Sequence, residues 1–192
     1  MLARYMSLMW FLWLVGGSMS SVAMPFSRLT SSPPPVQIKE DVRQLPSFTQ
    51  VHIDGPFNVR LHTDKKHKPG LKVRGDALDV VRIKTHVIKQ VLYISVDQKR
   101  ERFRSAPRLR MGSADLDINV PQLHRFVYQG QGTITAHKIH ANPVDISIDN
   151  PQNSTWSGRI GLRYLTLMGH GNTHITGINS QNLNVKLTGS PH

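Results

Sequence analysis

An internal repeat of about 20 residues constrains the fold of this chain more than any other sequence feature. Turn residues at Gly130, Asn150, Gly169 and Gly189 mark the repeat, and the spacings between them are 20, 19 and 20 residues. Around each marker the sequence has the pattern of a strand, a turn and a second strand. A unit this short cannot bury its own apolar side chains, so successive copies must stack on one another.

The simplest product of such stacking is a parallel β-helix with coils of about 20 residues. In each coil, the apolar residues of one strand face point inward and lie on their equivalents in the neighbouring coils. The predicted inward positions are Ile146, Ile148, Leu165, Leu167, Leu183, Val185 and Leu187. An antiparallel sandwich is the alternative, but it needs a hairpin at every turn, and the repeat has no fixed hairpin dipeptide.

The glycine turns allow a second interpretation, because Gly130-Gln131-Gly132 matches part of a dinucleotide-binding loop. The third glycine of that motif is missing, no helical pattern follows, and no P-loop lysine pattern is present. A second copy of the turn lies about two coils later, so we expect corners of a solenoid and no cofactor. The predicted structural turn residues are Gly130, Gly132, Gly169, Gly171 and Gly189.

The part of the chain before the repeat also has the alternating pattern of short strands. Apolar residues recur at every second position, with Gly, Pro, Asp and Asn between the segments. The alternating sets are Val51 and Ile53; Phe57, Val59 and Leu61; Leu71 and Val73; Leu92, Ile94 and Val96; and Leu116, Ile118 and Val120. Only residues 77–88 could hold a helix, and their β-branched residues argue against one. The sequence therefore predicts an all-β domain.

The N-terminal residues that precede this pattern predict export. Residues 1–23 have a basic residue, then an apolar run, then small residues. This order is typical of a cleaved secretory signal peptide, and the apolar run is shorter than the roughly 20 residues that cross a bilayer. Residues 24–46 contain a Ser-Ser-Pro-Pro-Pro run and are predicted to form an extended linker. We expect a folded domain over 47–192, located in the periplasm or at the cell surface.

Composition limits the chemistry and points to a class of partner. The 192 residues include no cysteine, which excludes disulfides, a thiolate nucleophile and thiolate metal sites. The formal net charge of +12 favours polyanions as partners. The densest basic cluster, interleaved with Phe103, is either a polyanion-binding loop or a solvated loop between two strands. Its basic residues are Lys99, Arg100, Arg102, Arg104, Arg108 and Arg110.

The histidines raise the question of a metal site. His137 with His140, and His170 with His174, are the locally close pairs among the 10 histidines. No carboxylate lies between the members of either pair. We therefore expect surface histidines and no metal site.

One strand carries the residues of a possible hydrolytic site. Asp145, Ser147 and Asp149 alternate onto one face, opposite inward Ile146 and Ile148. Two carboxylates at that spacing lie about 7 Å apart by strand rise, within reach of glycosidase geometry. Outward polar residues are also what any half-buried strand needs, and no acid pair lies on a neighbouring coil. Catalysis is therefore the alternative hypothesis, and no catalytic residue is predicted.

The order of motifs resembles the putative autotransporter adhesin head GIN domain family of bacteria. The residues that carry the resemblance are Phe48 to Leu61, Leu71 to Asp76, Val91 to Val96, Asp115 to Leu123 and the repeated Gly-x-Gly turns. The resemblance covers nearly all of the chain from Phe48 onward. It implies an exported right-handed parallel β-helix, and the family name suggests adhesion.

The sequence departs from the family pattern in two places. The second repeat replaces the glycine turn with Asp149-Asn150-Pro151, which can still turn. Relatives are expected to continue beyond the last repeat, so the resemblance also implies a truncated last coil or one capped by a partner subunit.

The sequence as a whole predicts a non-enzymatic exported protein with an adhesin-like binding domain. Its expected partners are anionic glycans, lipopolysaccharide or another surface ligand, with nucleic acid disfavoured by the envelope setting. The alternatives are a glycan-active β-helix enzyme and a structural element that self-associates through its last coil.

Overall fold

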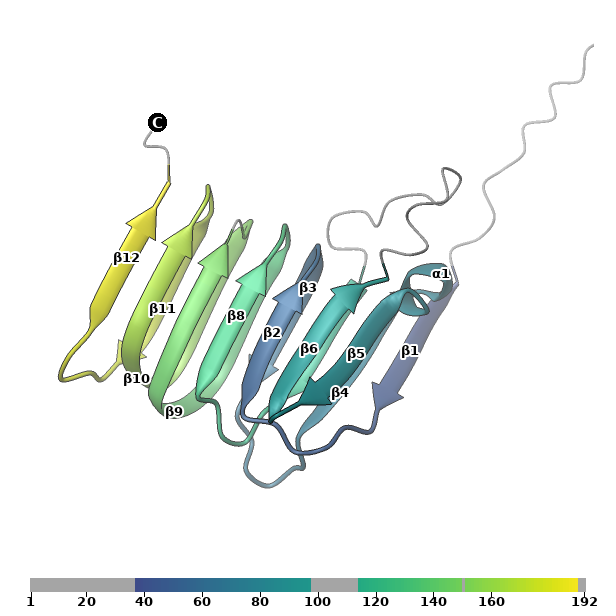
Figure 1. The fold of residues 1–192 in the computed structure, drawn as a ribbon, viewed down its shortest axis with the longest axis horizontal. Helices are drawn as coiled ribbons and strands as arrows, with labels where there is room; N and C mark the ends of the chain where they lie inside the picture. The colour runs from purple at the N-terminus through teal and green to yellow at the C-terminus, as the bar shows by residue number, and fades with distance from the viewer. Residues whose placement is uncertain (1–36, 98–113, 150, 190–192) are drawn as a thin grey trace, which may run out of the picture. The chain divides into compact units, whose positions relative to one another are not determined.

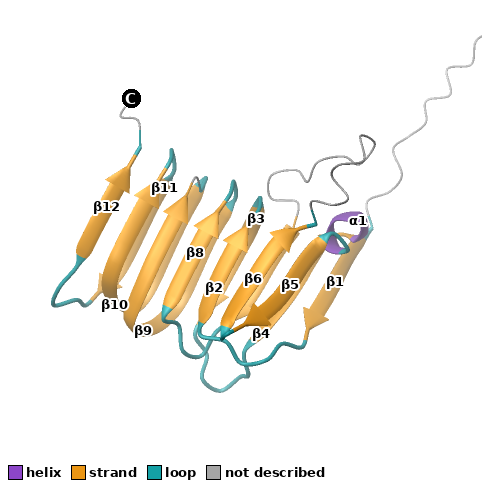
Figure 2. Cartoon of the chain, in the orientation of Figure 1, coloured by secondary structure: helices purple, strands orange, loops and turns teal. Residues whose placement is uncertain are grey.

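The computed structural model describes residues 37–97, 114–149 and 151–189. The strands form one 12-stranded sheet (Figure 1). They are β1 (Ile38–Arg43), β2 (Gln50–Asp54), β3 (Phe57–His62), β4 (Gly70–Asp76), β5 (Ile83–Ile88), β6 (Val91–Val96), β7 (Ala114–Asn119), β8 (Arg125–Gln129), β9 (Thr133–Asp149), β10 (Asn153–Met168), β11 (Asn172–Ile178) and β12 (Asn184–Thr188). Helical structure in the described residues is limited to α1 (Ala77–Val80) (Figure 2). The all-β prediction is confirmed.

The sheet is mixed, which corrects the prediction of a parallel β-helix for the whole domain. The pairs β1–β4, β4–β7 and β5–β6 are antiparallel, whereas the other pairs are parallel. A two-residue loop joins β5 to β6, and its residues Lys89 and Gln90 have φ angles of 49° and 64°. Positive φ at both positions is the geometry of a type I′ hairpin turn. Because neither residue is Gly, Asn or Asp, the sequence carried no signal for this hairpin.

Parallel strands in the C-terminal part pair with a register that equals the sequence repeat. Leu165 lies beside Ile146 on one side and Val185 on the other. In the other half of β10, Trp156 lies beside Ala136 and Ile175. The predicted stacking of equivalent residues 19 to 20 positions apart is therefore observed between β9, β10, β11 and β12.

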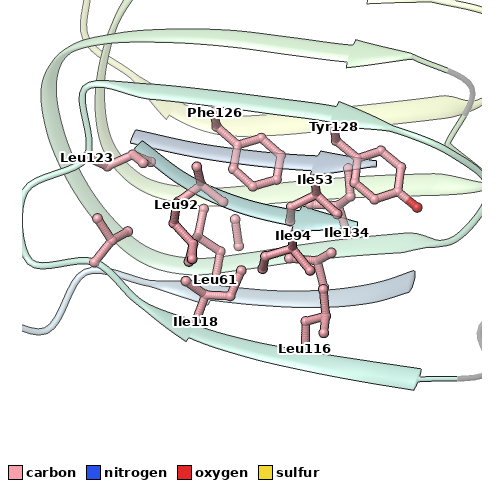
Figure 3. Packing of buried hydrophobic residues seen from close by; sticks show 14 of the residues in the cluster. Ile53, Leu61, Leu92, Ile94, Leu116, Ile118, Leu123, Phe126, Tyr128 and Ile134 are labelled. Atoms are coloured by element: carbon pink, nitrogen blue, oxygen red, sulfur yellow. The ribbon is translucent and has the colours of Figure 1, made fainter. Parts of the chain in front are cut away.

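The core lies between two sets of apolar residues that run across neighbouring strands. In the first set each member is the register partner of the next, in the order Leu92, Val51, Phe126, Ile146 and Leu165. The second set runs in the same way through Leu71, Ile118, Leu61, Ala136 and Trp156. All ten side chains are buried, and Figure 3 shows residues of β2, β6 and β8 facing residues of β3, β7 and β9. The rings of Phe126 and Trp156 join the two sets through an edge-to-face contact with centroids 5.1 Å apart.

The predicted linker over residues 24–46 includes a strand, which corrects that assignment. β1 pairs antiparallel with β4, so the sheet begins at Ile38. The side chain of Arg43 fixes this strand, because its guanidinium donates to the carbonyl of Ile83 at 2.8 Å and to the hydroxyl of Thr85 at 3.0 Å. The sequence pattern missed β1 because this strand has no strong alternating signal. Its apolar residues Ile38 and Val42 are exposed.

Some of the predicted inward positions are buried, whereas those near the last strand are exposed. Ile146, Ile148 and Leu165 are buried, and Leu167 packs against the core. Leu183, Val185 and Leu187 are exposed, with Leu187 at 70%. Val185 and Leu187 keep the predicted register on β10, but no described strand lies on their other side. The apolar stack therefore ends exposed at β12.

Gly130 occupies a turn that requires glycine. Its φ is 146°, and a Cβ atom at this position would overlap the carbonyl oxygen of Gly55. The turn brings two parts of the chain together, because Gly55 donates its amide to Gln129 and Gly130 donates its amide to Asp149. An L-residue here would therefore strain its own backbone and displace a neighbouring turn.

We expect Gly130→Ala to lower the free energy of unfolding by about 2 kcal/mol or more, because it adds both strain and overlap. Gly70→Ala is the matched control, since its nearest neighbour would be the carbonyl oxygen of Lys68 at 3.9 Å. This control should change stability by less than about 0.5 kcal/mol. Urea unfolding measures both values, and equal midpoints for the two variants would contradict the role of Gly130.

Candidate functional site

Several bends of the chain meet at one corner of the domain. The loop over residues 63–69 follows β3 and lies against the bend of β9, where the hydroxyl of Thr63 donates to the carbonyl of Lys138 and accepts from the amide of His140. The bend of β10 follows next, with Arg159 in register with His140. Residues 121–124 complete the corner, because the carbonyl of His124 accepts from the amide of Asp145 at 3.0 Å. We call residues 63–69, 121–124, 137–142 and 158–161 the basic corner.

The basic corner contains a hollow of about 510 Å³, which we call the corner hollow. Its lining combines two permanent cations, two imidazoles and three side-chain amides. These are Lys65, Arg159, His124, His140, Gln122, Asn142 and Asn179. No Asp or Glu of the described residues lines it. The hollow therefore presents positive charge and hydrogen-bonding groups to whatever enters it.

Strand pairing places the central pair of this lining. Arg159 and His140 are 19 residues apart in sequence and lie side by side on parallel strands, which are about 4.8 Å apart. The Nδ1 atom of His140 donates to the carbonyl oxygen of Lys138 at 2.9 Å, since a carbonyl can only accept. This bond orients the imidazole and leaves Nε2 for another partner.

Asn142 enters the lining because of a glycine on the next strand. A Cβ atom at Gly161 would overlap the side-chain oxygen of Asn142. Gly161 therefore makes the space in which the amide group of Asn142 lies over β10. On the far side of β10, the backbone N–H of Asn179 donates to the carbonyl of Ile160 at 2.9 Å, which fixes the position of this third residue with a side-chain amide.

Asn119 positions the loop that carries Lys65. Its side chain is buried, accepts from the amide of Asp64 at 2.9 Å and donates to the carbonyls of Asp64, His67 and Lys68. The sequence pattern does not indicate this residue, because an Asn at the end of a strand carries no signal of such a role. The loop over residues 63–69 and the bend of β9 are also not related by the repeat of 19 to 20 residues. Their proximity therefore depends on the whole fold.

The carboxylate of Asp64 is held within the same loop. It accepts from the amide of Lys66 at 2.8 Å and pairs with Nδ1 of His67 at 2.7 Å. The hydrogen bond from Lys66 is the largest cause that lowers the pKa of Asp64, and the bond with His67 lowers it further. Asp64 therefore remains ionised and closes the loop by local bonds.

The residues of the predicted basic cluster, Lys99, Arg100, Arg102, Arg104, Arg108 and Arg110, lie outside the described residues. The structure therefore leaves the cluster as a prediction.

The strand with the suggested hydrolytic residues has the predicted alternation. Asp145, Ser147 and Asp149 alternate along β9 with the buried residues Ile146 and Ile148. Asp145 is held by Arg163, whose Nε donates to Oδ1 at 2.8 Å and whose terminal nitrogen donates to Oδ2 at 2.6 Å. This bidentate pair raises the pKa of Arg163 above its ordinary value and occupies both oxygens of the carboxylate. A carboxylate engaged in this way is poorly suited to act as an acid or a nucleophile.

The histidines are distributed over several elements. His137 contacts the hydroxyl of Ser157 at 3.1 Å, whereas His140 lines the corner hollow. His62 pairs with Asp117 and His67 with Asp64. Over residues 37–97, 114–149 and 151–189, no group of three or more His, Asp or Glu residues lies close enough to hold a metal ion.

The family model of the putative auto-transporter adhesin, head GIN domain, matches residues 47–192. The chain therefore belongs to this family, as its order of motifs suggested. No match was found among curated proteins. Among the described residues, no helix is long and apolar enough to cross a membrane.

One solved structure supports the fold. A putative lipid binding protein from Parabacteroides distasonis ATCC 8503 is similar with a TM-score of 0.61 at 17% identity, over 78% of this chain and 62% of that chain. This chain thus spans less than two thirds of that relative. A putative adhesin from Bacteroides fragilis NCTC 9343 matches over 82% of this chain and 99% of that chain, with a TM-score of 0.48 at 12% identity.

We expect the pKa of Asp64, measured by NMR titration, to lie below its ordinary value. Because folding depresses this pKa, the contribution of Asp64 to stability is present above the unfolded pKa and is lost as the pH falls through the folded pKa. Asn119→Ala should release the loop and raise the pKa of Asp64 toward its ordinary value. An unchanged pKa in that variant would contradict the positioning role of Asn119.

Proposed function

We propose that this chain is an exported, non-enzymatic binding domain of the bacterial envelope or cell surface, which engages anionic glycans or lipopolysaccharide through its basic corner. The observation that carries this proposal is the corner hollow, where Lys65, Arg159 and two histidines meet three amides. Charged groups gathered on one concave surface raise the local concentration of an oppositely charged partner.

The chemistry of the lining favours a glycan over nucleic acid. Binding of single-stranded nucleic acid commonly uses aromatic rings on which bases stack. The lining of the corner hollow includes no Phe, Tyr or Trp of the described residues. Amide side chains such as Asn142 both donate and accept hydrogen bonds, and this matches sugar hydroxyls.

The other parts of the proposal rest on separate observations. The signal-peptide pattern of residues 1–23 supports export, and the family name supports adhesion. The pairing of Asp145 with Arg163 supports a non-enzymatic role. The parallel register of β8 to β12 supports the right-handed β-helix that the family resemblance implies for this part of the sheet.

Binding of the full chain to acidic and neutral polysaccharides and to lipopolysaccharide tests the proposal. We expect acidic ligands to bind and their binding to weaken as salt rises from about 50 to 500 mM, because salt screens exposed charges. A corner variant with Lys65, Lys138 and Arg159 replaced by Gln should lose about tenfold or more in affinity. A control variant with Lys39, Arg74 and Lys186 replaced by Gln loses the same charge elsewhere and should stay within about twofold.

Four results would contradict the proposal. The first is that acidic ligands show no salt-sensitive binding. The second is that the corner and control variants lose the same affinity. The third is that the corner variant still binds, whereas binding is abolished in a variant with neutral residues in place of Arg100, Arg102, Arg104, Arg108 and Arg110. Turnover of an acidic polysaccharide by the unaltered chain would contradict the non-enzymatic role.

A further inference from the structure

We propose that the corner hollow is a discrete site for one saccharide unit that carries a carboxylate. This inference rests on the proposed function and narrows it from a charged surface to a single pocket. A volume of about 510 Å³ lies within the range of about 300–1,000 Å³ that is usual for small-molecule sites.

The two permanent cations of the hollow are free to bind an anion. The side chains of Lys65 and Arg159 form no hydrogen bond or ion pair with another residue of the described part of the chain. Asp64, the carboxylate nearest to Lys65 in sequence, is already engaged by Lys66 and His67. Arg159 is exposed, and its planar guanidinium matches the two oxygens of a carboxylate.

The amide residues provide the second half of the recognition. Gln122, Asn142 and Asn179 come from three different segments and line the same hollow. Amides offer both donors and acceptors, whereas an inorganic anion such as phosphate uses mainly donors. Three amides beside two cations therefore fit a ligand with both hydroxyl groups and a negative charge.

Two apolar residues of the lining suit contact with the carbon skeleton of a sugar. Leu123 and Ala141 also line the hollow, so the lining includes apolar atoms among its polar groups. The backbone around the site is held by strand pairing and by the bonds of Thr63 and Asn119. A pocket formed in advance loses less conformational entropy on binding than a mobile surface does.

Calorimetric titration of the full chain with galacturonate, galactose and inorganic phosphate tests the inference. We expect galacturonate to bind at least about tenfold more tightly than galactose, because galactose lacks the group that pairs with Arg159 and Lys65. Phosphate should also bind more weakly than galacturonate, since it leaves the amide acceptors unpaired.

Two variants and a control locate the binding in the hollow. Arg159→Gln should lower galacturonate affinity by about tenfold or more, whereas Arg74→Gln, an equal loss of charge on β4, should stay within about twofold. Asn142→Asp keeps the shape of the side chain but adds negative charge, so it should weaken galacturonate far more than galactose. Far-UV circular dichroism checks that each variant is folded.

The outcomes separate this inference from the function on which it rests. Salt-sensitive binding of acidic polymers without galacturonate binding would overturn the discrete site and leave the proposed function standing. Loss of both would overturn both. Equal affinity for galacturonate and galactose, tighter binding of phosphate, or equal effects of Arg159→Gln and Arg74→Gln would also overturn the inference.

Discussion

Backbone hydrogen bonding between parallel strands, in a register of 19 to 20 residues, is the constraint on which the rest of the C-terminal structure depends. It places Ile146 beside Leu165 and Ala136 beside Trp156, so that β9 and β10 share one core. The pairing continues through the bends of β9 and β10, with small shifts in register, and sets Arg159 beside His140. Core packing and the chemistry of the basic corner therefore follow from one repeat.

The two ends of the described sheet differ in how the apolar core is covered. At one end, Arg43 of β1 donates to the carbonyl of Ile83 and to the hydroxyl of Thr85, and α1 lies next to β1 and β4. At the other end, Val185 and Leu187 follow the register of buried residues and yet remain exposed. The end at β1, where the core is covered, belongs to the antiparallel part of the sheet. In that part, loops and a hairpin replace the repeat.

Sequence patterns predicted what depends on local alternation and on the repeat. They gave the inward positions Ile146, Ile148 and Leu165 and the alternation of Asp145 and Asp149 on β9. They missed β1, because its apolar residues are exposed, and the β5–β6 hairpin, because Lys89 and Gln90 carry no turn signal. The spacing of His140 and Arg159 matches the repeat and could have suggested their proximity, whereas Lys65 and Asn119 reach the corner through tertiary contacts alone.

An engineered cross-link tests the central register most directly, because the chain has no cysteine of its own. Cysteines at positions 140 and 159 replace register partners on parallel strands, whose Cα separation of about 5 Å allows a disulfide. Peptide mapping after mild oxidation should find this bridge within one chain. The control pair places cysteines at positions 140 and 163. Position 163 lies four residues beyond position 159 on β10, so this pair should stay reduced. Absence of the 140–159 bridge, or equal bridging by the control pair, would contradict the register and the corner that depends on it.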